Sequence, residues 1–135
     1  MSQENVEIVR RLWRAAEHGD DRTVYALYDP GIVWKSGTPG QLQFAGGSYH
    51  GHEGVRQFFL EWLESFGTYQ AKAETFIEAG DKVVVGYRVS GRGRESGVDV
   101  EMVRWNVYRI RNGLVVHVEV FGTQAEALEA AGLSE

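Results

Sequence analysis

Two runs in which apolar and charged residues alternate, Val98–Arg111 and Leu114–Gly122, form the strongest pattern in the chain. Both runs are rich in β-branched and aromatic residues, so they predict two long strands whose two faces meet different surroundings. The pair Asn112-Gly113 separates them and favours a tight turn, because both turn positions need a positive φ. The pattern therefore predicts a long β-hairpin, one face of which is covered by the preceding chain.

In the chain before Val98, the spacing of apolar residues changes between that of helices and that of strands. Apolar positions at three- and four-residue steps predict helices from Ser2 to Gly19, over Thr23–Tyr28 and from Gly51 onward. Alternation predicts strands at the ranges 32–36, 69–79 and 82–90. A capping box, residues 123–126, predicts a short last helix. Between the first of these strands and the third helix, residues 37–51 read as a long polar, glycine-rich loop with Leu42 and Phe44 among its few apolar residues.

This order predicts an α+β fold rather than a parallel α/β fold, because the strands follow one another at the end of the chain. We expect a cone-shaped α+β barrel: a strongly curved antiparallel or mixed sheet wraps around the N-terminal helices and encloses a pocket. The 135 residues are expected to form one domain, 1–135.

Composition narrows the classes of function. The net charge is −5 and no basic run occurs, which argues against a nucleic-acid or anionic-membrane surface. Cysteine is absent, which excludes disulfides and thiolate chemistry. The polar N-terminus and the lack of a long apolar run predict a cytoplasmic protein that is not bound to membranes.

Several segments also resemble a known family. They are Asn5–Arg11, Gly19-Asp20, Leu27–Pro30, Tyr49–Phe58, Gly80–Val85, Arg109–Gly113 and Ala125–Leu133. Through them the chain resembles the nuclear transport factor 2-like superfamily and, within it, the SnoaL-like proteins related to polyketide cyclases and steroid isomerases. The resemblance covers nearly the whole chain and implies the cone-shaped fold. It does not name a reaction, because this fold hosts isomerases, cyclases, epoxide hydrolases, dehydratases and binding modules.

The polar residues that such enzymes use are not matched here. Alignment with a steroid isomerase puts Leu12, Ser36 and Asn106 where the tyrosine, the carboxylate base and the oxyanion acid would stand. For the epoxide hydrolases, Tyr87 replaces the arginine, and Val89 and Val120 replace the two aspartates. The cyclase histidine and aspartate positions fall on Asn106 and Val120. The sequence therefore predicts neither steroid isomerisation nor epoxide opening.

Strand alternation instead predicts an aromatic, mostly neutral pocket. If Asn106 points inward, Arg104 and Tyr108 do too, and Tyr87 does so from the neighbouring strand. Asn106, Tyr87 and Arg104 are the candidate catalytic groups. The candidate substrate-binding residues are Leu12, Trp13, Trp34, Ser36, Phe58, Trp62, Tyr108, Val118 and Val120. Such a lining suits a hydrophobic small molecule, although any single aromatic residue is more simply a part of the core.

The remaining candidates concern ions and partners. His50 and His52 lie two residues apart but lack a third ligand at suitable spacing, so no metal and no cofactor is expected. His18 is interpreted as a cation at a helix C-terminus. The outer sheet face carries Trp105, Val107, His117 and Phe121, which predicts a homodimer through that face.

Two functions of different classes stay open. The first is an isomerase-, cyclase- or hydrolase-type enzyme that acts on a hydrophobic, oxygenated substrate. The second is a non-catalytic module of the same fold that binds a ligand or dimerises. The missing carboxylates favour the second, whereas an inward Arg104 favours the first, because a buried guanidinium needs an anionic partner.

Overall fold

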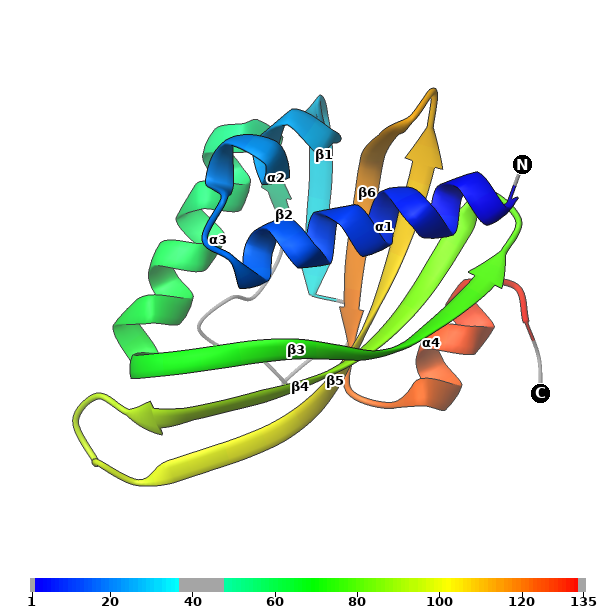
Figure 1. The fold of residues 1–135 in the computed structure, drawn as a ribbon. Coiled ribbons are helices and arrows are strands. Elements are labelled where there is room, and N and C mark those ends of the chain that lie inside the picture. Colours follow the sequence, from blue (N-terminus) through cyan, green and yellow to red (C-terminus); the bar gives the residue numbers. More distant parts are fainter. Residues whose placement is uncertain (1, 37–47, 134–135) are drawn as a thin grey trace.

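The computed structural model describes residues 2–36 and 48–133, and it is α+β as expected. Figure 1 shows a single curved sheet with helices on its sides. The helices are α1 (Ser2–Glu17), α2 (Asp21–Leu27), α3 (Gly51–Ser65) and α4 (Gln124–Ala130). The strands are β1 (Tyr28–Ser36), β2 (Ser48–His50), β3 (Phe66–Ala79), β4 (Lys82–Gly93), β5 (Asp99–Arg111) and β6 (Leu114–Phe121).

The sheet is mixed and does not close into a barrel. Its order is β2-β1-β6-β5-β4-β3, so β2 and β3 are its two edges. Among the described strands, only the β1–β6 pair is parallel, and the other pairs are antiparallel. The long β3, β4 and β5 bend across the molecule and give the sheet a concave and a convex face (Figure 1).

The hairpin that dominates the sequence pattern forms as predicted. Asn112 and Gly113 join β5 to β6 with φ values of 53° and 78°, the left-handed backbone that this turn requires. The β5–β6 register sets Asn106 opposite Val120 and Tyr108 opposite Val118. Because successive side chains of a strand alternate between faces, these four share the concave side, while Trp105 and Val107 lie on the convex side.

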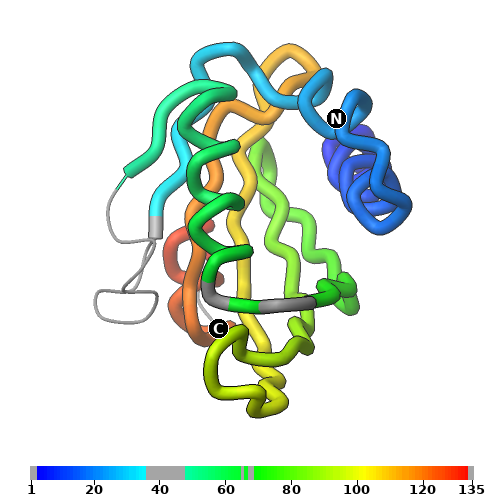
Figure 2. Tube along the Cα trace, turned by 90° about the vertical axis from the view of Figure 1, so that its left-hand side faces the viewer, coloured from blue at the N-terminus to red at the C-terminus, as the bar shows by residue number. Residues whose placement is uncertain are grey.

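The concave side carries the main core. Buried residues of α1, α2 and α3 pack there against the inward side chains of β1 and β4–β6. Figure 2, turned by 90°, shows that α1 and α3 lie apart over this face instead of packing against each other.

The convex side carries a second, smaller core beneath α4. Val84, Val107, Phe121 and Ala127 are buried there together. The predicted capping box starts α4, since the backbone N–H of Glu126 donates to Thr123 Oγ1 at 3.2 Å. The helix then folds back over strands β4–β6.

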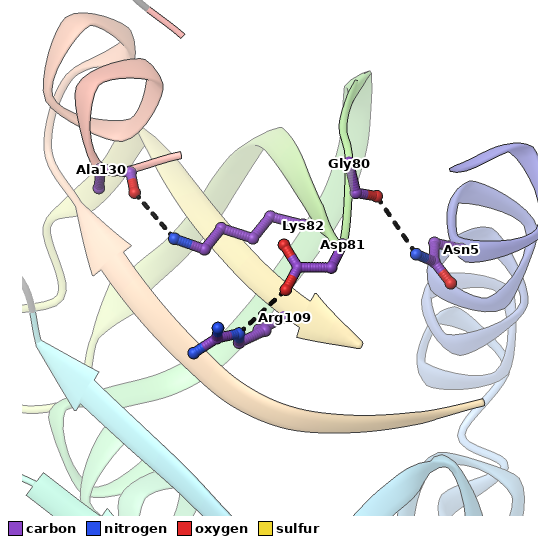
Figure 3. Close-up of polar contacts among 6 residues, drawn as sticks. All are labelled: Asn5, Gly80, Asp81, Lys82, Arg109 and Ala130. Atoms are coloured by element: carbon purple, nitrogen blue, oxygen red, sulfur yellow. Dashed lines mark hydrogen bonds and ion pairs between the residues drawn. The ribbon is translucent and has the colours of Figure 1, made fainter. Parts of the chain in front are cut away.

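The β3–β4 turn ties three distant elements together (Figure 3). The Asn5 side chain at the start of α1 donates to the Gly80 carbonyl at 3.3 Å. Arg109 of β5 pairs with Asp81 at 3.2 Å. Lys82 donates to the Ala130 carbonyl at 3.2 Å, at the C-terminal end of α4. One turn therefore holds both the helix on the concave side and the helix on the convex side.

Some predicted boundaries were wrong. The second helix begins at Asp21, because Asp20 is its cap: the N–H of Thr23 donates to Asp20 Oδ1 at 3.2 Å. The strand expected from Ile32 begins at Tyr28 and runs through Pro30, where a register shift in the β1–β6 ladder accommodates the proline.

Two further boundaries also differ. Strand β3 starts at Phe66 and strand β4 continues to Gly93. The expected loop over residues 37–51 contains the short strand β2, while Leu42 and Phe44 lie outside the described residues. Within the described part of the chain, no helix is long and apolar enough to cross a membrane.

Candidate functional site

A cavity of about 600 Å³ lies on the concave side between α1, α3 and the sheet. Eight of the predicted site residues line it: Leu12, Trp13, Trp34, Phe58, Trp62, Tyr87, Asn106 and Tyr108. They come from five elements, α1, β1, α3, β4 and β5, which meet only in the folded chain. The fold thus brings most of the predicted site together, although their role in binding stays a prediction.

Four predicted residues are not among the lining residues. Val118 and Val120 are buried in the main core of the concave side. Arg104 lies on the concave side of β5, paired with Tyr87 across the ladder, but it is only half-buried. Its Nη1 donates to the Val103 carbonyl at 3.1 Å, and its buried Nε has no hydrogen-bond partner among the described residues. The Ser36 side chain lies outside what the structure describes.

A chain of hydrogen bonds forms the polar centre of the cavity. Tyr87 donates its hydroxyl hydrogen to Asn106 Oδ1 at 2.9 Å, and Asn106 Nδ2 donates to the Tyr108 hydroxyl oxygen at 3.1 Å. Asn106 is 3% exposed and is the only buried polar residue among the described residues. Its amide is therefore already paired with protein groups, whereas an amide without a partner would be costly to bury.

The direction of these hydrogen bonds decides which hydrogen is left beside the cavity. The Asn106 oxygen accepts a hydrogen bond from Tyr87, and the Tyr108 oxygen accepts one from the Asn106 amide. The hydroxyl hydrogen of Tyr108 is then left at the end of the chain, beside the cavity that Tyr108 lines. A hydroxyl that accepts a hydrogen bond becomes a better donor, so the network strengthens Tyr108 as a donor.

Both tyrosines remain neutral near neutral pH. Burial raises the pKa of Tyr108 to about 12, against the opposing effect of the hydrogen bond from Asn106. Burial also raises the pKa of Tyr87 far above its ordinary range. These hydroxyls can donate or accept hydrogen bonds, but they are poor proton acceptors for catalysis.

Aromatic rings form the walls around this polar centre. Trp13 of α1 lies 5.0 Å from Tyr87, centroid to centroid, with an interplanar angle of 46°. On the other side, Trp34 of β1 lies 5.2 Å from Phe58 of α3. The Trp34 Nε1 is buried and has no hydrogen-bond partner among the described residues, so it is a further donor in the cavity lining. The arrangement suits a flat apolar molecule that carries a few acceptor oxygens.

Sequence reasoning missed the rim of the cavity. Glu17 and His18 reach the rim from the end of α1, and β3 borders it at Gln70 and Lys72. A signal for Glu17 was present, because it follows Trp13 by four residues and so shares its face of the helix. His18 was interpreted only as a helix-terminal cation. Its ring Nδ1 does lie 2.8 Å from the Arg14 carbonyl at that terminus.

His50 ends β2, and His52 lies in the first turn of α3. Within the described residues, no group of three His, Cys, Asp or Glu side chains is placed to hold a metal ion. His52 instead contacts the Tyr28 carbonyl at 3.0 Å and packs against the rings of Tyr25 and Tyr28.

The predicted dimer face is partly covered by the chain itself. Val107 and Phe121 are only 5% and 8% exposed, because α4 packs on them. Trp105 and His117 stay half-buried on the same face. Burial lowers the pKa of His117, with nearby Lys35, Arg109 and Lys82 acting in the same direction and Glu119 opposing them. The homodimer remains a prediction, now with Trp105 and His117 as its accessible residues.

Comparison with known proteins assigns the chain to a family. The model of the SnoaL-like domain matches residues 9–118. The chain belongs to the SnoaL-like family. That match spans α1 to β6 and so includes every element that lines the cavity.

Solved structures agree with this assignment. The SnoaL-like chain is 27% identical to an NTF2-like protein from Burkholderia thailandensis, with a TM-score of 0.76 and coverage of 92% of this chain and 96% of that one. It is 23% identical to a putative SnoaL-like polyketide cyclase from Jannaschia, with a TM-score of 0.74 and coverage of 96% and 92%. It is 20% identical to TerC, co-crystallised with polyporic acid, with a TM-score of 0.77 and coverage of 96% and 98%. No curated protein matches the sequence. These similarities support the fold.

Proposed function

We propose that this SnoaL-like protein binds a flat, hydrophobic small molecule through an oxygen that accepts a hydrogen bond from Tyr108. The observation that carries the proposal is the hydrogen-bond chain Tyr87–Asn106–Tyr108, which ends in a donor beside the cavity. The aromatic walls would hold the apolar body of the ligand. In this proposal Asn106 positions Tyr108 and does not itself contact the ligand.

A second candidate function is conversion of the bound molecule by isomerase-, cyclase- or hydrolase-type chemistry. The deep part of the cavity offers neutral tyrosines, an amide and indoles, which argues for binding alone. The rim offers Glu17 and His18, which are titratable side chains and could move a proton. The alternative to both is a module without a ligand that serves only in dimerisation.

A matched pair of ligands tests the binding proposal. The carbonyl of 2-acetylnaphthalene accepts a hydrogen bond, whereas 2-isopropenylnaphthalene has nearly the same shape and no acceptor oxygen. We expect the wild type to prefer the ketone by about tenfold in equilibrium dialysis, the value of one good hydrogen bond. The variant Tyr108→Phe should lose this preference and keep its affinity for the hydrocarbon.

Tyr87→Phe is the matched control, because it removes a hydroxyl at the other end of the same chain. It should keep most of the preference for the ketone. If Tyr87→Phe loses the preference and Tyr108→Phe keeps it, the hydrogen bonds run in the opposite direction and the proposal is wrong. If neither compound binds the wild type, the cavity is not a site for such ligands. Polyporic acid, with which TerC was crystallised, is a third probe.

A further inference from the structure

The deep cavity contains donors but no side chain suited to accept a proton, so any base must stand at its rim. Tyr87 and Tyr108 are held neutral by burial, and Asn106 does not ionise. Of the described lining residues, only Glu17, His18 and Lys72 carry a carboxylate, an imidazole or an amine. All three are exposed. The question is which of them is arranged to exchange a proton with a bound molecule.

Of these three side chains, His18 is the one for which a contact indicates which ring nitrogen carries the hydrogen. Its Nδ1 lies 2.8 Å from the backbone carbonyl of Arg14. A carbonyl oxygen can only accept a hydrogen bond, so Nδ1 must carry the hydrogen. In the neutral imidazole the lone pair is then on Nε2. The same contact fixes the ring against the last turn of α1 and so limits its orientations.

The two other rim groups are less suited to this task. An ammonium group has no lone pair until it loses its proton, and a solvated carboxylate is a weak base near neutral pH. An imidazole can take up and release a proton there, which is why it is the commonest general base in enzymes. The chain has two further histidines near the site, but His50 and His52 are not among the residues that line the cavity.

We propose that His18 is a proton-transfer group at the mouth of the cavity, acting through Nε2 on ligands held at Tyr108. This inference rests on the proposed function, since it needs the ligand to be bound in the cavity. The substrate class is an oxygenated aromatic or carbonyl compound with an acidic C–H bond. Nε2 takes the proton, the C–H electron pair moves toward the ligand oxygen, and that oxygen receives the Tyr108 hydrogen bond. Return of the proton at another carbon completes an isomerisation without any oxidant or reductant.

A general probe of base catalysis tests this without knowledge of the natural substrate. The compound 5-nitrobenzisoxazole is flat and apolar, and loss of its ring C–H proton to a base opens the ring. The C–H electron pair forms the nitrile, the N–O bond breaks, and its electrons stay on the oxygen of a coloured cyanophenolate. We expect saturable ring opening by the wild type, faster than in buffer. His18→Gln should lower this rate by about tenfold or more, within the usual range for removal of a general base.

His50→Gln is the matched control, because His50 is exposed on β2 and is not among the lining residues. It should keep the wild-type rate. Binding of the same probe is measured separately through quenching of tryptophan fluorescence, since Trp13, Trp34 and Trp62 line the cavity. Both glutamine variants replace exposed residues, and thermal unfolding checks that they fold as the wild type does.

The outcomes separate this inference from the proposed function. Binding without ring opening above buffer, or an unchanged rate in His18→Gln, overturns the role of His18 and leaves the binding proposal intact. A loss of rate in Glu17→Gln together with a normal rate in His18→Gln assigns the base to Glu17 and also overturns it. Absence of any binding contradicts the proposed function and the inference together.

Discussion

The two faces of strands β4, β5 and β6 differ in how they are covered, although the same strands build both. On the convex face, α4 packs directly on Val84, Val107 and Phe121. On the concave face, α1 and α3 lie apart and leave a cavity of about 600 Å³ around Asn106. One side is filled by apolar side chains, and the other keeps space around a paired polar group. The convex face carries a small core without a gap, whereas the concave face combines the larger core with a cavity.

The largest loss of stability is expected from a substitution on the convex face. Phe121→Ala should lower the free energy of unfolding by about 3–5 kcal/mol, because a buried aromatic ring is removed beneath α4. Urea unfolding measures this loss. Val98→Ala is the control, since Val98 is 58% exposed and its truncation should change stability by less than about 0.5 kcal/mol. A similar loss of unfolding free energy in both variants would show that Phe121 is not buried beneath α4.

A smaller effect is expected at the polar centre of the open face. Asn106→Leu removes the partner of two buried hydroxyls, so we expect a loss of stability of about 1–3 kcal/mol. The same substitution in a Tyr87→Phe, Tyr108→Phe background should cost much less, because no hydroxyl then lacks its amide partner. Equal losses in the two backgrounds would show that the three side chains are not coupled.

This prediction differs from what the sequence alone indicates. An inward amide in an apolar pocket suggests a group without partners, whose replacement by leucine would leave stability nearly unchanged. The structure pairs that amide with Tyr87 and Tyr108. Alternation along two strands places all three side chains on one face, but the pairing also depends on the β4–β5 register, which the sequence gives only to within a residue or two.

Other elements were predictable for local reasons. Asn112-Gly113 encodes its own turn, and Thr123 caps the helix that follows it. The position of α4 on the convex face was not predictable, because a helix of seven residues does not itself specify which distant strands it covers. That is why Val107 and Phe121 were interpreted as a free dimer surface. The place of His18 at the cavity was missed because α1 and the sheet come together only in the folded chain.

Alkaline pH should lower the stability contributed by the concave face in particular, because the buried tyrosines lie on that face. Burial raises the pKa of Tyr108 to about 12, above the value of about 10 for a tyrosine in an unfolded chain. The folded state therefore keeps its proton when the unfolded state has lost it. The stability contributed by Tyr108 is complete below about pH 10 and is lost as the pH rises toward about 12.

Urea unfolding at about pH 8 and about pH 11 measures this loss. The wild type should lose more stability between the two conditions than Tyr108→Phe, which has no phenol to ionise at this position. An equal decline in the two proteins would contradict the burial of the Tyr108 hydroxyl.

The smallest effect on stability is expected at the exposed part of the convex face. Trp105 packs beside the α4 cluster but is only half-buried. If the predicted homodimer forms there, Trp105→Arg should convert dimers into monomers at micromolar concentration, because it places an unpaired charge in the contact. Light scattering measures the mass of each protein. A monomeric wild type would contradict the predicted dimer and leave the cavity unaffected.

The infrared spectrum of bound 2-acetylnaphthalene tests the role of the concave face most directly. Its carbonyl stretch moves to lower frequency when the oxygen accepts a hydrogen bond. We predict a lowered frequency in the wild type and in Tyr87→Phe, and a return in Tyr108→Phe to the value seen in an apolar solvent. A carbonyl frequency that is the same in the wild type and in Tyr108→Phe would contradict the claim that the cavity holds an oxygenated ligand through Tyr108.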